Sequence, residues 1–337
     1  MSKYQNLLLH LIGLLTRQGK EVLHRFYVEV VELMKDSGIS KSHYWFQVVS
    51  EAECDSDMAK AVAERMNKKA RELWEISDSN MGAAVEMLKT VSPRHVRLIL
   101  ETDSSTLKDL PQLCNKLAET KCRVSLEDFY SWKNPNKSAT DLYFSKISNS
   151  SSSCSVDGLF GNFESCTPIT EEMDHLDTLA VAISDDLQAA ALRHSLTNIV
   201  TALAVMEKKL RNVALHIGKS VTASSLPKMV FNITDNIRFC LVLPHVEDID
   251  VHWTVDVIEV LWPKGNCIIN VGFPKSCLSH WGCEQLLKEL HDHSLTGINI
   301  IITSSNITKQ ELQSLNTKEN SLSLDVLEER SWFYGPI

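Results

Sequence analysis

Four short apolar stretches in the C-terminal half of the chain repeat one pattern at nearly equal intervals. Their anchor residues Leu215, Leu241, Val271 and Ile301 are 26, 30 and 30 residues apart. In the first three stretches a second apolar residue stands two positions after the anchor, as a half-buried strand requires. A loop and a helical segment follow. A period of this length predicts stacked strand-and-helix units, and arrays of such units usually bind other macromolecules.

The repeated units resemble leucine-rich repeats, whose consensus is L-x-x-L-x-L-x-x-N/C-x-L. The third copy fits this consensus best, with Ile268, Val271, Phe273, Ser276 and Leu278 at its five positions. The fourth copy has Ile298, Ile301, Thr303 and Asn306. The first two copies are poorer, because Asn212 and Arg238 replace the first leucine. The resemblance covers about residues 174–315.

A leucine-rich array implies a parallel sheet, an outer helical layer and a concave strand face that serves as the usual binding surface. The candidate binding residues on that face are His216, Gly218, Val242, Gly272 and Ile302. An ordinary α/β domain with alternating strands and helices is the alternative interpretation.

Residues 3–120 carry helical periodicity. Leucines from Leu7 to Leu15 recur on one helical face. The expected buried stripe of the second helix is Val22, Phe26, Val30 and Leu33. Further helical patterns cover about 56–76, 80–90, 92–101 and 106–120. These patterns predict a helical module over residues 1–130.

Residues 7–38 resemble part of a caspase-recruitment domain, a death-fold family. The resemblance rests on the apolar run Leu8–Leu15, the turn Thr16–Lys20 and the aromatic Phe26. It implies that Gly19 makes a tight turn with positive φ and that Phe26 is core. Only the second half of a six-helix bundle is covered, so this hairpin must pack on residues 41–120. An unrelated helical hairpin with a Gly turn is the alternative.

A death-fold segment ahead of leucine-rich repeats is similar to the layout of NOD-like receptors, which also carry a nucleotide-binding domain. The Gly-Lys pairs at Gly19 and Gly218 lack the earlier glycine of a P-loop, since Leu14 and Val213 stand there. We therefore expect no nucleotide-binding domain and no cofactor. The layout fits a receptor fragment, a truncated paralogue or a decoy.

Residues 131–170 differ in composition from both flanks. Trp132–Ser138 is turn-rich and Ser148–Ser153 is of low complexity. This predicts a Ser-rich linker between the helical module (1–130) and the leucine-rich-repeat-like domain (171–337). The predicted fold class is α plus α/β, a helical bundle followed by a short array of parallel strands with outer helices.

The net charge and the cysteine content limit which partners and which cellular compartment are expected. The net charge of −9 argues against a general nucleic-acid or anionic-membrane surface. The nine cysteines are irregularly spaced, which favours a reducing, cytoplasmic environment. The apolar run Leu7–Leu15 is far shorter than the roughly 20 residues of a membrane span, so no membrane partner is expected.

The best candidate for chemistry is the trio Cys277, His280 and Cys283. Zinc requires four such ligands, but the spacing is not a paired C-x-x-C form, and the repeat register makes both cysteines small core residues. No G-x-S-x-G, H-E-x-x-H or G-x-G-x-x-G motif occurs in the sequence. We therefore expect no metal and no catalytic residue.

These observations favour a non-enzymatic protein–protein interaction protein, an adaptor or regulator. The resemblances imply innate-immune or apoptotic signalling and death-fold proteins among the partners. Two alternatives remain open: an α/β enzyme with a Cys or metal site, and a structural subunit of a larger complex.

Overall fold

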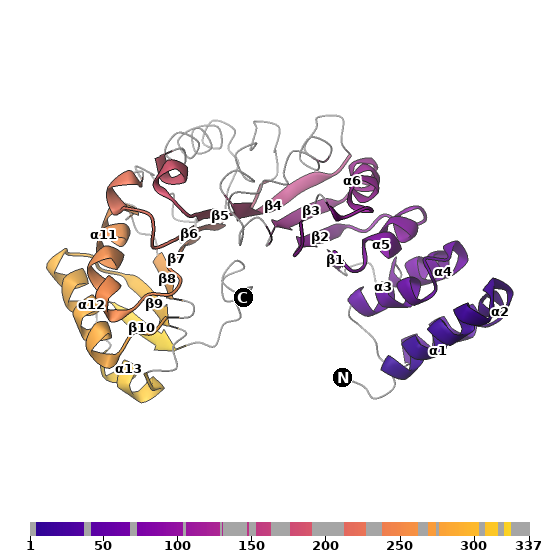
Figure 1. The fold of residues 1–337 in the computed structure, drawn as a ribbon, viewed down its shortest axis with the longest axis horizontal. Coiled ribbons are helices and arrows are strands. Elements are labelled where there is room, and N and C mark those ends of the chain that lie inside the picture. Colours follow the sequence, from indigo (N-terminus) through magenta and orange to yellow (C-terminus); the bar gives the residue numbers. More distant parts are fainter. Residues whose placement is uncertain are drawn as a thin grey trace. The chain divides into compact units, whose positions relative to one another are not determined.

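The computed structural model arranges helices and parallel strands along the chain (Figure 1). It describes residues 5–36, 42–67, 73–103, 106–128, 130, 147, 153–162, 176–190, 212–226, 238–261, 269–273, 276–302, 307–315 and 320–324. The chain divides into two compact units, Met1–Gly158 with Glu172–His175, and Leu159–Glu171 with Leu176–Ile337. A mixed α/β protein with parallel strands is thereby confirmed.

The first unit opens with helices and continues with alternating strands and helices. Its elements are α1 (Gln5–Gln18), α2 (Lys20–Asp36), α3 (Ser42–Glu51), α4 (Ser56–Asn67), β1 (Trp74–Ser77), α5 (Met81–Leu88), β2 (His95–Leu100), α6 (Leu110–Glu119) and β3 (Arg123–Asp128). Strand β4 (Ser155–Asn162) begins in this unit and lies within the segment predicted as a linker. Strand β2 pairs in parallel with both β1 and β3.

The first two helices form a hairpin around Gly19, whose φ of 121° confirms the predicted tight turn. Helix α1 contacts α3 and α2 contacts α4, which confirms that the hairpin packs on the residues after 41. The prediction that Phe26 is core is wrong, since this residue is 41% exposed. Val30 is buried as predicted, but Leu33 is exposed, and Leu23 and Val31 complete the buried stripe because the helix is rotated by about one residue from the expected orientation.

The helix predicted over 92–101 is also wrong, because β2 occupies His95–Leu100. Burial along β2 alternates at first and then becomes continuous. A short apolar run of this kind gives the same sequence pattern in a buried strand and in a buried helix. The sequence over 56–76 likewise contains both α4 and β1. Helices α5 and α6 confirm the patterns over 80–90 and 106–120.

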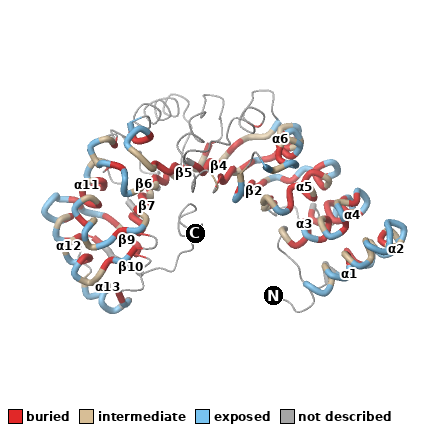
Figure 2. Tube along the Cα trace, viewed as in Figure 1, coloured by how far each residue is buried: buried red, intermediate tan, exposed pale blue. Residues whose placement is uncertain are grey.

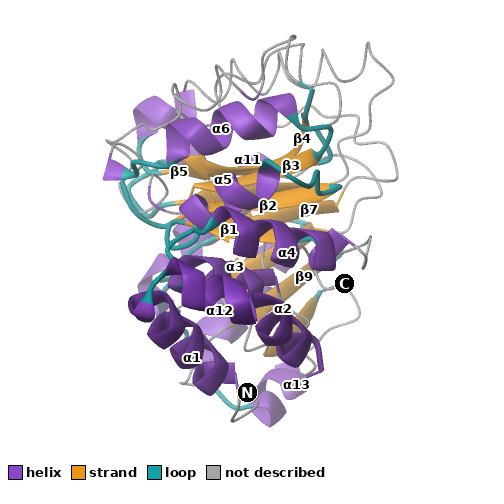
Figure 3. Ribbon diagram, turned by 90° about the vertical axis from the view of Figure 1, so that its right-hand side faces the viewer, coloured by secondary structure: helices purple, strands orange, loops and turns teal. Residues whose placement is uncertain are grey.

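The core of the first unit lies between its strands and the helices that cover one of their faces. Figure 3 shows α3 and α5 in front of β1 and β2. Trp74 of β1 meets Phe46 of α3 edge to face, with ring centroids 5.4 Å apart. Figure 2 shows that buried residues gather on the strands and on the helix sides that face them.

The second unit contains β5 (Thr178–Ile183), β6 (Asn212–Ile217), the 3₁₀ turn η2 (Ala223–Ser225), β7 (Arg238–Val242), η3 (Asp248–Asp250), α11 (Val251–Leu261), β8 (Ile269–Phe273), α12 (His280–Asp292), β9 (Ile298–Ile302), α13 (Lys309–Leu315) and β10 (Ser321–Leu324). From β5 to β10, each strand pairs in parallel with the next along the chain. Helices α11, α12 and α13 lie on one side of β8–β10 (Figure 1).

The strand register places the repeat anchors in one row across the second unit. The row is Val181, Leu215, Leu241, Val271, Ile300 and Leu322. Its first five members are at most 2% exposed. Burying one such side chain is worth about 1.5–3 kcal/mol, so this row is a main source of stability. The fourth predicted anchor, Ile301, is wrong by one residue, because β9 enters the sheet one residue earlier than the spacing suggested.

An aspartate after one strand holds the loop after the next strand in three places of the described chain. In each case the carboxylate accepts hydrogen bonds from backbone N–H groups of that loop. The pairs are Asp78 with Glu101 and Thr102, Asp186 with Thr222, and Asp248 with Ser279. Each bond satisfies a backbone N–H in a loop, where no neighbouring strand can accept it. Neighbouring strand-and-helix repeats within a unit are therefore joined through their loops as well as through the sheet.

The Asp248 link should be sensitive to the residue at 282. A Cβ at Gly282 would lie 2.0 Å from Oδ1 of Asp248, whose carboxylate also accepts a 2.6 Å bond from Oγ of Ser279. We expect Gly282→Ala to lower the free energy of unfolding by about 1–3 kcal/mol, because the carboxylate must move away. The control Glu284→Ala, on the same helix, should change it by less than about 0.5 kcal/mol. Equal urea midpoints for the two variants would contradict this role of Asp248.

Candidate functional site

The strands of the first unit have one face covered by helices and one face that carries polar side chains. We call the second face the open strand face. Its residues are Glu75 and Ser77 of β1, His95, Arg97 and Ile99 of β2, and Arg123, Ser125 and Glu127 of β3. They alternate with the residues that face the helices, as side chains along a strand must, and two of them, Ile99 and Glu127, are themselves buried.

Arg97 lies at the centre of the open strand face and joins three strands. Its Nη1 donates to Oε1 of Glu75 on β1 at 3.0 Å. Its Nε and Nη2 both donate to the carboxylate of Glu127 on β3, in a bidentate pair. Burial opposes the charge on Arg97, but Glu127 and Glu75 outweigh burial and raise the pKa of the guanidinium. The group is therefore a fixed positive charge between two carboxylates.

A second polar cluster lies beside the Arg97 group. Nε2 of His95 is 2.9 Å from Oγ of Ser125 and 3.5 Å from Oδ2 of Asp157 on β4. Oγ of Ser125 donates to Oδ1 of Asp157 at 3.2 Å. The parallel register explains the proximity, because Ser125 lies two residues beyond the partner of His95 on the same face of β3.

These three residue types match a serine-hydrolase triad, but their geometry does not. In a triad the imidazole uses one nitrogen for the serine and the other for the carboxylate. Here Ser125 and Asp157 both meet Nε2 of His95, and the serine hydroxyl donates to the carboxylate. This arrangement does not pass a proton from the hydroxyl through the ring. The cluster can bind through hydrogen bonds and charge, and it does not form an activated nucleophile.

Part of this polar surface is accessible. The side chains of Glu75 and His95 are each 40% exposed, whereas Glu127 is 5% exposed. Arg97, fixed by the buried Glu127, therefore orients Glu75, whereas Ser125 and Asp157 orient His95. Such a rigid, polar, strand-borne surface suits recognition of another macromolecule.

The five candidate binding residues predicted from the repeat lie at or beside the strands of the second unit. His216, Val242 and Gly272 share one row, which Ile301 continues. The register therefore replaces Ile302 by Ile301, since Ile302 pairs with Phe273 and belongs to a row on the opposite face. Gly218 follows β6, and its N–H donates to the carbonyl of Ile183 at 2.9 Å.

Most of these predicted residues are not accessible for binding. Val242 is fully buried and Ile301 is 8% exposed, and the two belong to one apolar cluster with Cys240 packed against it. Gly272 lies between them in the register and has no side chain to separate them. His216 is half-buried and its Nε2 atom is fully buried; burial lowers its pKa well below the ordinary value, so it is neutral at pH 7. Charge substitutions at Val242 would therefore disturb packing before they tested binding.

The three residues considered as an alternative metal site are not gathered in space. Across the described ranges, no group of three potential metal ligands includes Cys277, His280 or Cys283. Cys283 lies fully buried on α12, which confirms its predicted position on the buried helix face. The prediction that Cys277 is also a core residue is wrong, because this residue is exposed. His280 instead lies 3.7 Å from Glu284, one turn along the same helix.

The buried thiols are poor nucleophiles. Burial raises the pKa of Cys122, Cys240 and Cys283 to about 12 and also raises the pKa of Cys54. Since the thiolate is the reactive form, these groups are essentially all protonated at neutral pH. Their environments therefore favour structural roles over covalent chemistry.

The sequence reasoning missed the open strand face, because it predicted helices where β1 and β2 occur. One signal was present: Trp74-Glu75-Ile76-Ser77 alternates apolar and polar residues with a period of two. The same alternation appears at the start of β2, from His95 to Leu98. Pairing these two segments would have brought Glu75 and Arg97 together.

Comparison of the sequence with protein-family models gave no match, and comparison with curated proteins gave none either. In the described part of the chain, each helix is too short or too polar to traverse a bilayer.

Removal of Arg97 should destabilise the first unit. The variant Arg97→Met leaves Glu127 buried without its bidentate partner, and we expect a loss of about 3–5 kcal/mol in the free energy of unfolding. The double variant Arg97→Met/Glu127→Gln should recover most of this loss, because the buried charge is gone. Chemical denaturation of the full chain measures both.

The matched control is Lys116→Met, which removes a cation from the exposed pair with Glu119 on α6. Its effect should stay within about 0.5 kcal/mol. If Arg97→Met behaved like Lys116→Met, the Arg97 group would not be the organising element of this face.

Proposed function

We propose that this chain is a non-enzymatic protein-interaction module that binds a protein partner through the open strand face of its first unit. The observation that carries the proposal is that two accessible side chains are held in place from neighbouring strands: Glu75 by Arg97, and His95 by Ser125 and Asp157. A preorganised surface loses little side-chain entropy on binding, which favours affinity.

The repeating architecture supports a leucine-rich-repeat-like array as the scaffold. Strands follow chain order with parallel pairing, and the anchors recur in one buried row. In the third copy, Val271, Phe273, Ser276 and Leu278 are all buried, as the motif requires. Ile268 of that copy and both Thr303 and Asn306 of the fourth lie outside the described residues. Arrays of this kind present an extended strand surface to macromolecular partners.

The chemistry of the described residues supports binding over catalysis. The His95 cluster uses one imidazole nitrogen for both partners, and the buried thiols have raised pKa values. An α/β enzyme would instead require an activated nucleophile or base in a productive geometry.

A role in a particular signalling pathway is proposed only from the family resemblances of the sequence. A hairpin similar to half of a caspase-recruitment domain ahead of repeat-like units suggests an adaptor or regulator in innate-immune or apoptotic signalling. The turn at Gly19 is consistent with that resemblance, whereas the exposed Phe26 departs from it. The partner on this view is a cytoplasmic protein, death-fold proteins included.

A photo-crosslinking experiment tests the binding face directly. A benzophenone amino acid is placed in the full chain at His95 or at Arg123, which is exposed and pairs with His95 in the register. After irradiation in cells of the native host, we expect both positions to give an adduct with the same discrete second protein, because both flank the proposed contact.

The control position is Glu119 on α6, which is 66% exposed and belongs to the helical layer of the same unit. It should give no such adduct. Adducts of equal yield from position 119, or none from positions 95 and 123, would refute the open strand face as the binding surface.

A further inference from the structure

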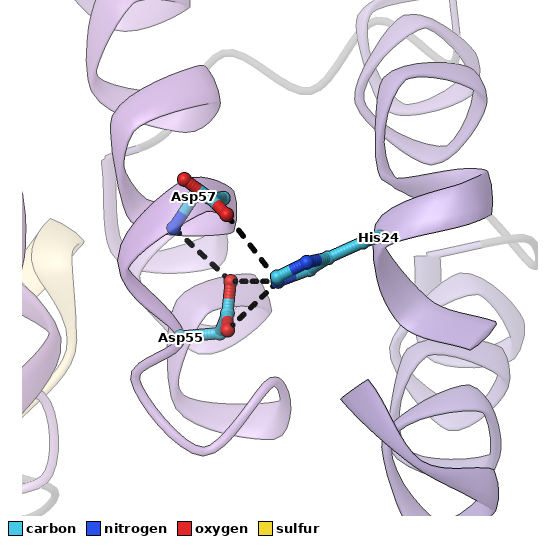
Figure 4. A group of neighbouring side chains, drawn as sticks. All are labelled: His24, Asp55 and Asp57. Carbon is cyan, nitrogen blue, oxygen red and sulfur yellow. Dashed lines mark hydrogen bonds and ion pairs between the residues drawn. The ribbon is translucent and has the colours of Figure 1, made fainter. Parts of the chain in front are cut away.

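A separate cluster of metal-ligating side chains lies among the N-terminal helices. His24 projects from α2 toward the first turn of α4, where Asp55 and Asp57 lie (Figure 4). One ligand atom from each of the three residues lies within 4.8 Å of the other two. This cluster lies on other elements than the open strand face, and the sequence motifs did not single it out.

The distances in the cluster match those between ligands of one zinc ion. Zinc binds imidazole nitrogen at about 2.0–2.1 Å and carboxylate oxygen at about 2.0–2.2 Å, so two ligands at a tetrahedral angle lie about 3.3 Å apart. Nε2 of His24 is 3.0 Å from Oδ2 of Asp55 and 3.5 Å from Oδ2 of Asp57. Both distances from His24 are therefore close to coordination spacing, and the two carboxylates lie within the 4.8 Å that encloses the whole group.

The fold orients Asp55 for this role. Its Oδ1 accepts the backbone N–H groups of Asp57 and Met58, both at 3.1 Å, and so caps α4. These bonds hold the carboxylate against His24, whose Nε2 lies 3.1 Å from Oδ1 and 3.0 Å from Oδ2; neither of these backbone bonds goes to Oδ2, which is the oxygen left for a metal ion. Hydrogen bonds to a ligand carboxylate are the usual second shell of a metal site.

The two other ligands leave room for solvent. The Asp57 side chain is 60% exposed and His24 is 37% exposed, whereas Asp55 is 6% exposed. One buried, oriented ligand with two accessible ones allows entry of an ion and a water molecule as the fourth ligand. A mixed set of one imidazole and two carboxylates suits zinc better than calcium or magnesium, which prefer oxygen ligands throughout.

We propose that His24, Asp55 and Asp57 form a zinc-binding site that joins α2 to the start of α4. Zinc takes the position between Nε2 of His24 and the two Oδ2 atoms, and any proton on Nε2 leaves to solvent. Because the ligands come from two helices that contact one another, binding restrains the N-terminal hairpin against the rest of the first unit.

The test uses the full chain after treatment with a chelator, titrated with zinc chloride in a calorimeter. The main variant is Asp57→Asn, because this exposed change keeps the size of the side chain and leaves the Asp55 cap intact. Both Asp57→Asn and a second variant, His24→Gln, should weaken zinc binding at least tenfold. The control is His293→Gln, which removes an exposed histidine paired with Glu259 at 2.9 Å in the other unit and should bind as the parent does.

Cobalt(II) distinguishes this site from binding by cysteines. The parent loaded with one equivalent of cobalt should show visible d–d bands without the near-ultraviolet band of a cobalt–thiolate bond, and Asp57→Asn should lose these bands. The proposal is overturned if the parent binds no zinc, if Asp57→Asn and His24→Gln bind as tightly as the parent, or if the cobalt spectrum is that of a thiolate site.

Discussion

Parallel pairing in chain order is the constraint on which the rest of this structure depends. When each strand pairs with the next along the chain, residues at equivalent positions line up in rows across the sheet. In the second unit one row is Val181, Leu215, Leu241, Val271 and Ile300, all buried. Because side chains alternate along a strand, the buried row lies on the sheet face that packs against the helices. The opposite face of the sheet carries a different set of side chains.

The two units use that second face differently. In the first unit it carries a charged group around Arg97, which bridges Glu75 and Glu127 and leaves polar atoms at the surface. In the second unit Val242 and Ile301 close over Gly272, and Asn299 donates to Asn270 on the same face. The same register therefore produces a partly accessible polar surface in one unit and, around Val242 and Ile301, a closed apolar cluster in the other. This difference is why the proposed binding face lies on β1–β3.

Elements of the fold could be predicted from the sequence where the apolar residues recur with a clear period. The anchors Leu215, Leu241 and Val271 were predictable because similar apolar stretches recur at intervals of 26 and 30 residues, whereas the fourth anchor was misplaced by one residue within a run of isoleucines. Strand β2 was predicted as a helix because its end is apolar on both faces. The binding face could not be derived in the same way, because Arg97 meets residues 22 and 30 positions away in the sequence. Such contacts depend on register, and a one-residue error in register moves every side chain to the other face.

The central claim, that in-register rows of buried anchors hold the strands together, is tested most directly by hydrogen–deuterium exchange of the free full chain. Backbone amides paired in a cooperative sheet exchange only when the sheet opens, whereas a short turn exchanges by local fluctuation. The account predicts that amides of β6, β7, β8 and β9 exchange more slowly, by several orders of magnitude, than those of the 3₁₀ turn Ala223–Ser225. Strand amides that exchanged as fast as this turn would contradict it.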